Sequence, residues 1–150
     1  MITAGKSGRS SPTSSSAIDG ADKASLIRAL GNANVALLAQ DASLAYLWTE
    51  NAPAKWGADG LVGRTDSEIF PEAVAENLTR LKKDVLSGSG RRHAEIEVSN
   101  SDGLSWFEIW LDPLRNVEGS IVGVVTTATE ITEQRLREQT LRTLLREVSH

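Results

Sequence analysis

Two histidines are the residues of this 150-residue chain whose chemistry is most accessible at neutral pH. Glu147 precedes His150 by about one helical turn, so its carboxylate could orient or polarise the imidazole. A neutral imidazole is nucleophilic near pH 7. His93 follows Arg91 and Arg92, and this basic trio could hold a carboxylate or a phosphate, or could form a solvated strand edge.

The composition excludes several other kinds of site. Cysteine is absent, which removes disulfides, thiolate metal sites, thiol catalysis and a cysteinyl-flavin adduct. The two histidines are far apart in the sequence, so we expect no metal site. The chain has no glycine-rich phosphate loop, and neither histidine has a clear nucleophile or orienting acid nearby in the sequence, which argues against a small stand-alone enzyme.

Charge and hydropathy predict the partners and the location of the protein. A net charge of −4 argues against a general nucleic-acid binder, so we expect no nucleic-acid partner. No apolar run approaches the ~18 residues needed to span a bilayer, and residues 1–20 lack the apolar segment of a signal peptide. We therefore expect a soluble, cytoplasmic protein with no membrane contact.

The first half of the chain predicts a tail, a helix and two strands. Residues 1–20 are rich in serine and glycine and are expected to form a disordered tail. A cap helix is expected within residues 21–33, beginning at Asp22. The apolar runs Val35–Ala39 and Leu44–Thr49 are predicted to be short strands joined by a turn.

A helical middle and three more strands complete the domain predicted over residues 34–132. Thr65 and Glu68 fit a capping box for one helical turn, and a longer helix with Pro71 at its first position runs to Leu86. Three strands follow it: His93–Val98, Ser105–Asp112 and Ile121–Thr129. This order predicts an α+β domain with a five-stranded antiparallel sheet and helices on one face.

Two tryptophans are predicted on the outer face of the sheet. Trp106 and Trp110 alternate with Phe107 and Ile109 along one strand, so the two pairs face opposite ways. Exposed tryptophans are unusual, so a cover is expected. The candidates are the cap helix and a second subunit, which makes this a candidate dimer or cap-helix face. Alternatively, the helix simply caps its own sheet.

The last predicted element is a coiled-coil helix over residues 133–150. Leu141, Leu144, Leu145 and Val148 recur at helical spacing on one face. The helix reaches the last residue without a cap, a glycine or a proline. We therefore expect that it is a signalling helix that continues into a further domain of a longer protein.

Several motifs occur in a familiar order. They are Leu61-Val62-Gly63-Arg64-Thr65, Trp106-Phe107-Glu108, Asp112-Pro113-Leu114-Arg115, Glu118-Gly119-Ser120-Ile121-Val122-Gly123 and Glu130-Ile131-Thr132-Glu133. Together they resemble a PAS domain over about Ala33 to Thr132. The last motif is similar to the family's Asp-Ile-Thr exit motif, with Glu in place of Asp. The resemblance implies a PAS fold and a sensory role.

The run Leu144-Leu145-Arg146-Glu147-Val148-Ser149-His150 is similar to the opening of the phosphoacceptor box of sensor histidine kinases, in the form of the HWE-like group. This resemblance implies that His150 accepts the γ-phosphoryl group of ATP on a ring nitrogen. It implies that ATP and Mg bind in a separate kinase domain, so that the 150 residues alone are inactive. It also implies a homodimer through the sheet face and the C-terminal helix, and a response regulator as partner.

The resemblance implies a cavity for a small-molecule ligand beside the last two strands. The residues facing it are Phe107, Ile109, Leu111, Val124, Thr126 and Ala128. The alternative is that these residues simply fill the core. Haem-binding PAS domains take an axial histidine from the main helix, and Pro71–Leu86 contains none, so we expect no haem and no cofactor in this part of the protein.

The resemblance also implies a signal relay. A change in the sheet would pass through Glu130, Ile131 and Thr132 into the exit helix and reposition His150 relative to the kinase domain. The alternative function is a ligand-free PAS module for dimerisation or protein interaction. A third reading, a PAS domain that controls a cyclic-nucleotide enzyme, is disfavoured by the Glu-x-x-His ending.

Overall fold

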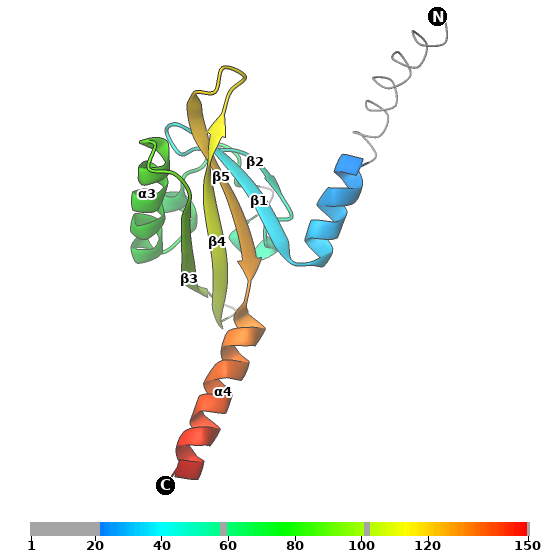
Figure 1. Cartoon of the computed structure of the whole chain (residues 1–150), viewed down its shortest axis with the longest axis vertical. Coiled ribbons are helices and arrows are strands. Elements are labelled where there is room, and N and C mark those ends of the chain that lie inside the picture. Colours follow the sequence, from blue (N-terminus) through cyan, green and yellow to red (C-terminus); the bar gives the residue numbers. More distant parts are fainter. Residues whose placement is uncertain (1–21, 58–59, 101–102, 150) are drawn as a thin grey trace, which may run out of the picture.

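The computed structural model describes residues 22–57, 60–100 and 103–149. The tail predicted over residues 1–20 and the candidate phosphoacceptor His150 lie outside these residues, so the expectations for both stay predictions. Figure 1 shows a single sheet, with helical segments against one face and a long helix leaving its lower end.

Five antiparallel strands form the sheet, in the spatial order β2-β1-β5-β4-β3. This arrangement confirms the predicted α+β class and the predicted order of two strands, a helical middle and three strands. The strands are Val35–Asp41 (β1), Tyr46–Glu50 (β2), Arg92–Asn100 (β3), Gly103–Arg115 (β4) and Ile121–Glu130 (β5).

The segments between β2 and β3 are a short 3-10 helix and two α-helices: Ala54–Trp56 (η1), Asp66–Ile69 (α2) and Glu72–Leu86 (α3). The predicted capping box is confirmed, because the Glu68 carboxylate accepts a hydrogen bond from the Thr65 backbone N–H at 3.2 Å. Pro71, predicted as the first helical residue, is instead the N-cap of α3. Its ψ of 152° is extended, so helical geometry begins one residue later.

The hydrophobic core lies between α3 and the sheet. Ala75, Leu78 and Val85 recur along one face of α3 and are buried. That face packs against β3, β4 and β5, whose alternate residues point inward. Burial of this apolar surface is the main source of stability for such a layer, and it fixes the position of α3 on the sheet.

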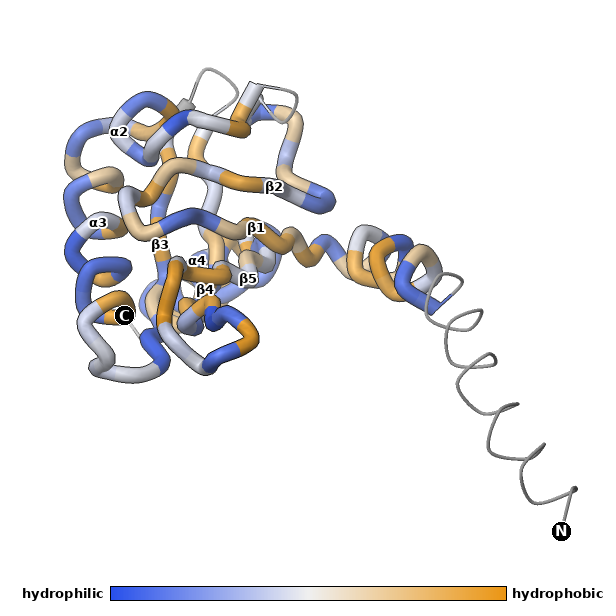
Figure 2. The backbone as a smooth tube through the Cα atoms, turned by 90° about the horizontal axis from the view of Figure 1, so that it is seen from above, coloured by the Kyte–Doolittle hydropathy of each residue, from blue (hydrophilic) through white to orange (hydrophobic). Residues whose placement is uncertain are grey.

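Two helices extend beyond this core. α4 (Thr132–Ser149) follows β5 after one residue, and its leucines 141, 144 and 145 and Val148 are exposed. A helix over residues 22–32 precedes β1 and projects away from the sheet (Figures 1 and 2). Both predicted helices are therefore present, while pairing of α4 in a coiled coil stays a prediction. In the described part of the chain, no helix is long and apolar enough to cross a membrane.

β5 is the central strand, and one glycine sets its distance from β1. Gly123 pairs with Asp41 across the sheet. A Cβ atom at Gly123 would collide with the backbone carbonyl oxygen of Gln40, and it would lie 3.2 Å from the Cα of Asp41. Only a residue without a side chain lets the two backbones approach this closely.

Gly123→Ala is therefore expected to destabilise the domain by at least ~2 kcal/mol, because backbone rather than a flexible side chain must move. The matched control is Gly60→Ala, whose new methyl group would meet only the Arg64 side chain at 3.9 Å. Urea unfolding followed by tryptophan fluorescence measures both free energies of unfolding. Equal stabilities of the two variants would contradict this account of the β1–β5 contact.

Candidate functional site

The six residues predicted to face a ligand cavity all lie on the inner face of the sheet. Each of them is at most 5% exposed. Five belong to the main hydrophobic cluster with α3, and the sixth, Thr126, is polar. They pack together as the interpretation of a filled core requires, and whether a ligand enters among them stays a prediction.

Three buried side chains around this core, Gln40, Trp56 and Thr126, have a polar atom without a hydrogen-bond partner among the described residues. Thr126 Oγ1 and Gln40 Oε1 are buried and have no hydrogen-bond partner among the described residues. Gln40 uses only its amide nitrogen, which donates to the Leu44 carbonyl oxygen at 2.8 Å. Because Gln40 pairs with Val124 on β5, two residues from Thr126, both side chains lie on neighbouring strands. Buried polar atoms normally have partners, so this pair is a candidate contact for a small polar molecule.

A buried ion pair joins the helical layer to β2. Lys82 Nζ on α3 lies 2.6 Å from Asp66 Oδ2 on α2, and each side chain is 1% exposed. Tyr46 on β2 donates a hydrogen bond to the other carboxylate oxygen at 2.5 Å. Burial lowers the pKa of Lys82 against the opposing effect of Asp66, and burial next to that carboxylate raises the pKa of Tyr46.

Sequence reasoning missed the buried group of Lys82, Asp66 and Tyr46. Lysine is usually solvated, and Lys82 was not considered among the core residues. The signal was its spacing, because Lys82 follows Leu78 by four positions and precedes Val85 by three, on the apolar face of the helix. A charged residue at such a position needs a buried partner of opposite charge, which Asp66 supplies.

The predicted relay residues form a hydrogen-bonded junction between β5 and α4. The Ile131 backbone N–H donates to the Trp106 carbonyl oxygen at 2.8 Å. The Trp106 N–H donates to Thr132 Oγ1 at 3.1 Å, and that hydroxyl donates to Glu130 Oε2 at 2.8 Å. The three residues are therefore brought together beside Trp106 of β4, at the point where α4 begins.

Lys55, which the sequence did not single out, links η1 to this junction. Its Nζ lies 3.2 Å from Glu130 Oε2 and donates to Ser105 Oγ at 2.7 Å. The next residue, Trp56, is buried, with its ring centroid 4.8 Å from that of Phe107. The short helix η1 therefore contacts both Phe107, a predicted cavity residue, and the junction between β5 and α4, which we call the exit junction.

A second ion pair holds the first turns of α4 to the sheet. Arg135 Nη2 lies 3.3 Å from Glu95 Oε1 on β3. Both side chains are more than a third exposed, so the pair itself contributes little to the free energy of folding. Its effect is on geometry, because it ties the start of α4, which also contacts β4, to a second strand of the sheet.

One of the two covers expected for the tryptophans, the cap helix, is wrong, and the other, a second subunit, stays a prediction. Trp106 is 7% exposed and does not form an open surface. Trp110 is half-buried beneath two side chains of its own sheet edge, with His93 at 4.0 Å between ring centroids and Arg91 at 4.2 Å. Helix 22–32 does not cover them and instead faces Leu37 and Trp48 on β1 and β2. The long side chains of His93 and Arg91 cover Trp110. The alternation of residues along β4 does not reveal such a cover.

His93 and Glu147 occupy different surroundings. The His93 Nε2 atom lies 3.1 Å from Glu108 Oε2, so the basic trio is partly neutralised at the strand edge. Glu147 is exposed on α4, one turn before the region where His150 falls outside the described residues. The relation between Glu147 and His150 therefore stays a prediction.

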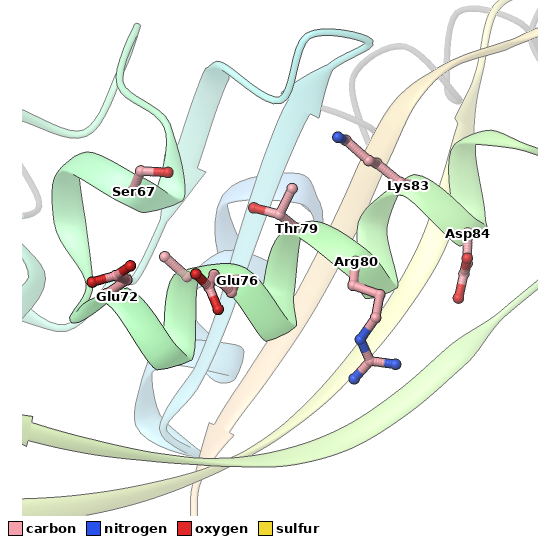
Figure 3. Close-up of a pocket in the computed structure, with 8 residues that line it drawn as sticks. Ser67, Glu72, Glu76, Thr79, Arg80, Lys83 and Asp84 are labelled. Carbon is pink, nitrogen blue, oxygen red and sulfur yellow. The ribbon is translucent and has the colours of Figure 1, made fainter.

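An open groove of about 760 Å³ runs along the outer side of α3. Figure 3 shows its polar side chains projecting from α2 and α3. Both signs of charge line it, with Glu72 and Glu76 at one end and Arg80 and Lys83 towards the other. Mixed, solvated charge of this kind is typical of an ordinary helix surface and selects no ligand.

A family model described as the PAS fold matches residues 30–136, which include the whole sheet and the junction. The chain belongs to the PAS family. The expected PAS fold is thereby confirmed, and the buried core, η1 and exit junction are parts of a PAS domain.

The PAS domain is also similar in sequence to parts of two proteins described as a probable histidine kinase and a histidine kinase. It is 29% identical over 112 residues to probable histidine kinase 1 of Oryza sativa subsp. indica, and 27% identical over 111 residues to histidine kinase 5 of Arabidopsis thaliana. Each alignment covers 73% of this chain but only 12% of the relative. The chain thus corresponds to a small part of these proteins.

Solved structures share the PAS fold at low sequence identity. A sensory box sensor histidine kinase from Vibrio cholerae has a TM-score of 0.53 at 16% identity, over 78% of this chain and 98% of that one. An RNA-binding Light-Oxygen-Voltage receptor has a TM-score of 0.61 at 22% identity, over 82% and 37%. These likenesses show the fold alone, and the expected absence of a nucleic-acid partner stays a prediction.

Lys82→Met is expected to destabilise the PAS domain by about 3–5 kcal/mol, because it leaves the Asp66 carboxylate buried without its cation. The double variant Asp66→Asn/Lys82→Met removes both charges and should regain most of the loss. Lys83→Met, on the exposed side of the same helix, is the control and should change stability by less than ~0.5 kcal/mol. Urea unfolding tests the set, and additive losses in the double variant would contradict the pairing.

Proposed function

We propose that this chain is the sensory PAS region of a two-component sensor histidine kinase, and that it controls autophosphorylation of His150 through α4. The observation that carries the proposal is the junction at Glu130 and Thr132, because it joins the core of the domain to the helix that leads towards His150. The similarity to two plant histidine kinases supports the class of protein.

The full-length protein is proposed to be the enzyme, a histidine protein kinase. ATP with Mg would bind in a separate kinase domain. A His150 ring nitrogen would attack the γ-phosphorus of ATP, and the bond between that phosphorus and the β–γ bridging oxygen would break, releasing ADP. A response regulator would then take the phosphoryl group. The 150 residues alone are expected to be inactive, and a cytoplasmic location remains part of this proposal.

A small molecule is the proposed input. Gln40 Oε1 and Thr126 Oγ1 supply two buried acceptors without partners, which suits a ligand that carries a hydrogen-bond donor. Entry of a ligand between α3 and the sheet would press on Phe107, whose ring contacts Trp56. Lys55 would then carry the displacement from η1 to Glu130.

A homodimer is the proposed assembly, formed in part by α4. Leu141, Leu144 and Val148 are each more than half exposed on a helix that has few contacts with the rest of the domain. Pairing with a second copy would bury this apolar face, as in a coiled coil. The same observation favours the second candidate function, a PAS module that binds no ligand and serves only for dimerisation or protein interaction.

The kinase proposal is tested with the full-length protein that contains this chain, incubated with γ-labelled ATP and Mg. The His150→Ala variant is expected to lose all acid-labile label, because no ring nitrogen remains at that position. The His93→Ala variant is the matched control and should be labelled like the parent, since His93 lies on the edge strand β3 and outside the phosphoacceptor motif. Equal labelling of parent and His150→Ala protein would favour the interaction module instead.

Lys55→Met is expected to loosen the exit junction without unfolding the domain. The ion pair with Glu130 is partly exposed, so global stability should fall by less than ~1 kcal/mol. Hydrogen exchange of the Ile131 amide should nevertheless rise several-fold, because local opening becomes easier. Lys83→Met is the control, and the charge swap Lys55→Glu/Glu130→Lys should recover part of the protection. Unchanged exchange in Lys55→Met would remove Lys55 from the relay.

A further inference from the structure

Two glutamates lie opposite each other on β3 and β4, on the outer face of the sheet. Glu95 pairs directly with Glu108 in the strand register, and residues that pair in this way point to the same face. Each of the two side chains is 41% exposed. Like charges at directly opposite positions destabilise a sheet, so each carboxylate needs a cation nearby.

Each carboxylate has a different cation. Arg135, in the first turn of α4, forms an ion pair with Glu95, with 3.3 Å between Nη2 and Oε1. His93 on β3 contacts Glu108, with 3.1 Å between Nε2 and Oε2. Arginine stays charged at every pH that proteins normally meet, whereas histidine ordinarily changes its charge between pH 5 and 8. One carboxylate is therefore always neutralised, and the other is neutralised only when its histidine is protonated.

The other charged groups around His93 do not replace it. Arg91, two residues earlier on the same face, pairs with Asp112 at 3.1 Å between Nε and Oδ1 and lies 4.2 Å from the centre of the Trp110 ring. His93 stacks on the same ring, with 4.0 Å between centroids. Glu97, farther along β3, adds a carboxylate rather than a cation. Without the charge of His93, the two opposed glutamates would depend on the arginine of α4.

Arg135 has the capacity to bind both glutamates. A guanidinium group carries five N–H donors in a planar fork. The Arg135 Nε atom is buried and has no hydrogen-bond partner among the described residues, so this donor is free beside the one that meets Glu95. The Arg135 backbone N–H donates to the Ile131 carbonyl oxygen at 3.0 Å, within the turn that leaves the exit junction. Movement of this arginine towards Glu108 would therefore draw the start of α4 onto β4.

We infer that these four side chains form a pH-sensitive tether, in which protonation of His93 loosens the start of α4. When His93 is neutral, the negative charge of both glutamates attracts Arg135 to the sheet. A neutral imidazole can still donate one hydrogen bond to Glu108, but it does not cancel the charge. When His93 is protonated, its positive charge neutralises Glu108 and repels the guanidinium group. The tether belongs to the PAS domain itself and does not depend on the kinase proposal.

Amide hydrogen exchange of the whole 150-residue chain tests the inference. Protection over residues 135–138 is measured at about pH 8 and about pH 5.5, on either side of the usual histidine range, and is corrected for the intrinsic effect of pH on exchange. In the parent, protection should fall about threefold at the lower pH, the size of effect expected for partly exposed ion pairs. Circular dichroism checks that every variant is folded.

Three variants separate the tether from other effects of pH. His93→Gln carries no charge at position 93 and should keep the higher protection at both pH values. Arg135→Gln should show the lower protection at both. Glu97→Gln is the matched control, because it removes a carboxylate from the same strand face outside the tether, and it should respond to pH like the parent.

A pH response that persists in His93→Gln would overturn the inference. His150 is unchanged in that variant, so a response that came from the second histidine would persist there. Equal protection of the parent at both pH values, or a rise on acidification, would also contradict the inference. Histidine is ordinarily neutral at pH 8, so the His93→Ala control of the kinase experiment is unaffected when labelling is measured at that pH.

Discussion

The hydrogen bond from the Ile131 amide to the Trp106 carbonyl oxygen is the constraint on which the account depends. It extends the pairing of β5 with β4 one residue beyond the strand, so α4 starts at a fixed place and in a fixed direction. β5 is also the central strand, with inward residues such as Val124 and Ala128 in the core. A rearrangement of the core therefore acts on the strand that positions the exit helix.

The two sides of the core differ in how firmly they are held. α3 is fixed by its apolar face and by the buried contact of Lys82 with Asp66, and loss of either charge alone would be costly. η1 is a single short turn, held by the Trp56 ring against Phe70 and Phe107 and by the partly exposed Lys55 contact with Glu130. Movement in response to a ligand is therefore expected in η1 rather than in α3.

The sequence predicted the fold closely because its strongest signals are local. Alternation along Ser105–Asp112, the capping box at Thr65 and the spacing on α3 each depend on a few neighbouring residues. The exit motif was recognised for the same reason. Lys55 and Lys82 were missed because their partners lie 75 and 16 positions away, and long-range ion pairs leave little trace in local pattern. The cover over Trp110 was missed because it comes from the side chains of a neighbouring strand.

The central claim is that the junction at Glu130–Thr132 sets kinase output. The most direct measurement compares, in the full-length protein, amide exchange over residues 131–135 with the autophosphorylation rate across variants of the junction. The set includes Thr132→Val, which removes the hydroxyl hydrogen bonds at the junction, and Glu95→Gln and Arg135→Gln, which each remove the ion pair between β3 and α4. The account predicts that the rate changes in step with exchange at the junction. Rates that stay constant while exchange varies tenfold would contradict it.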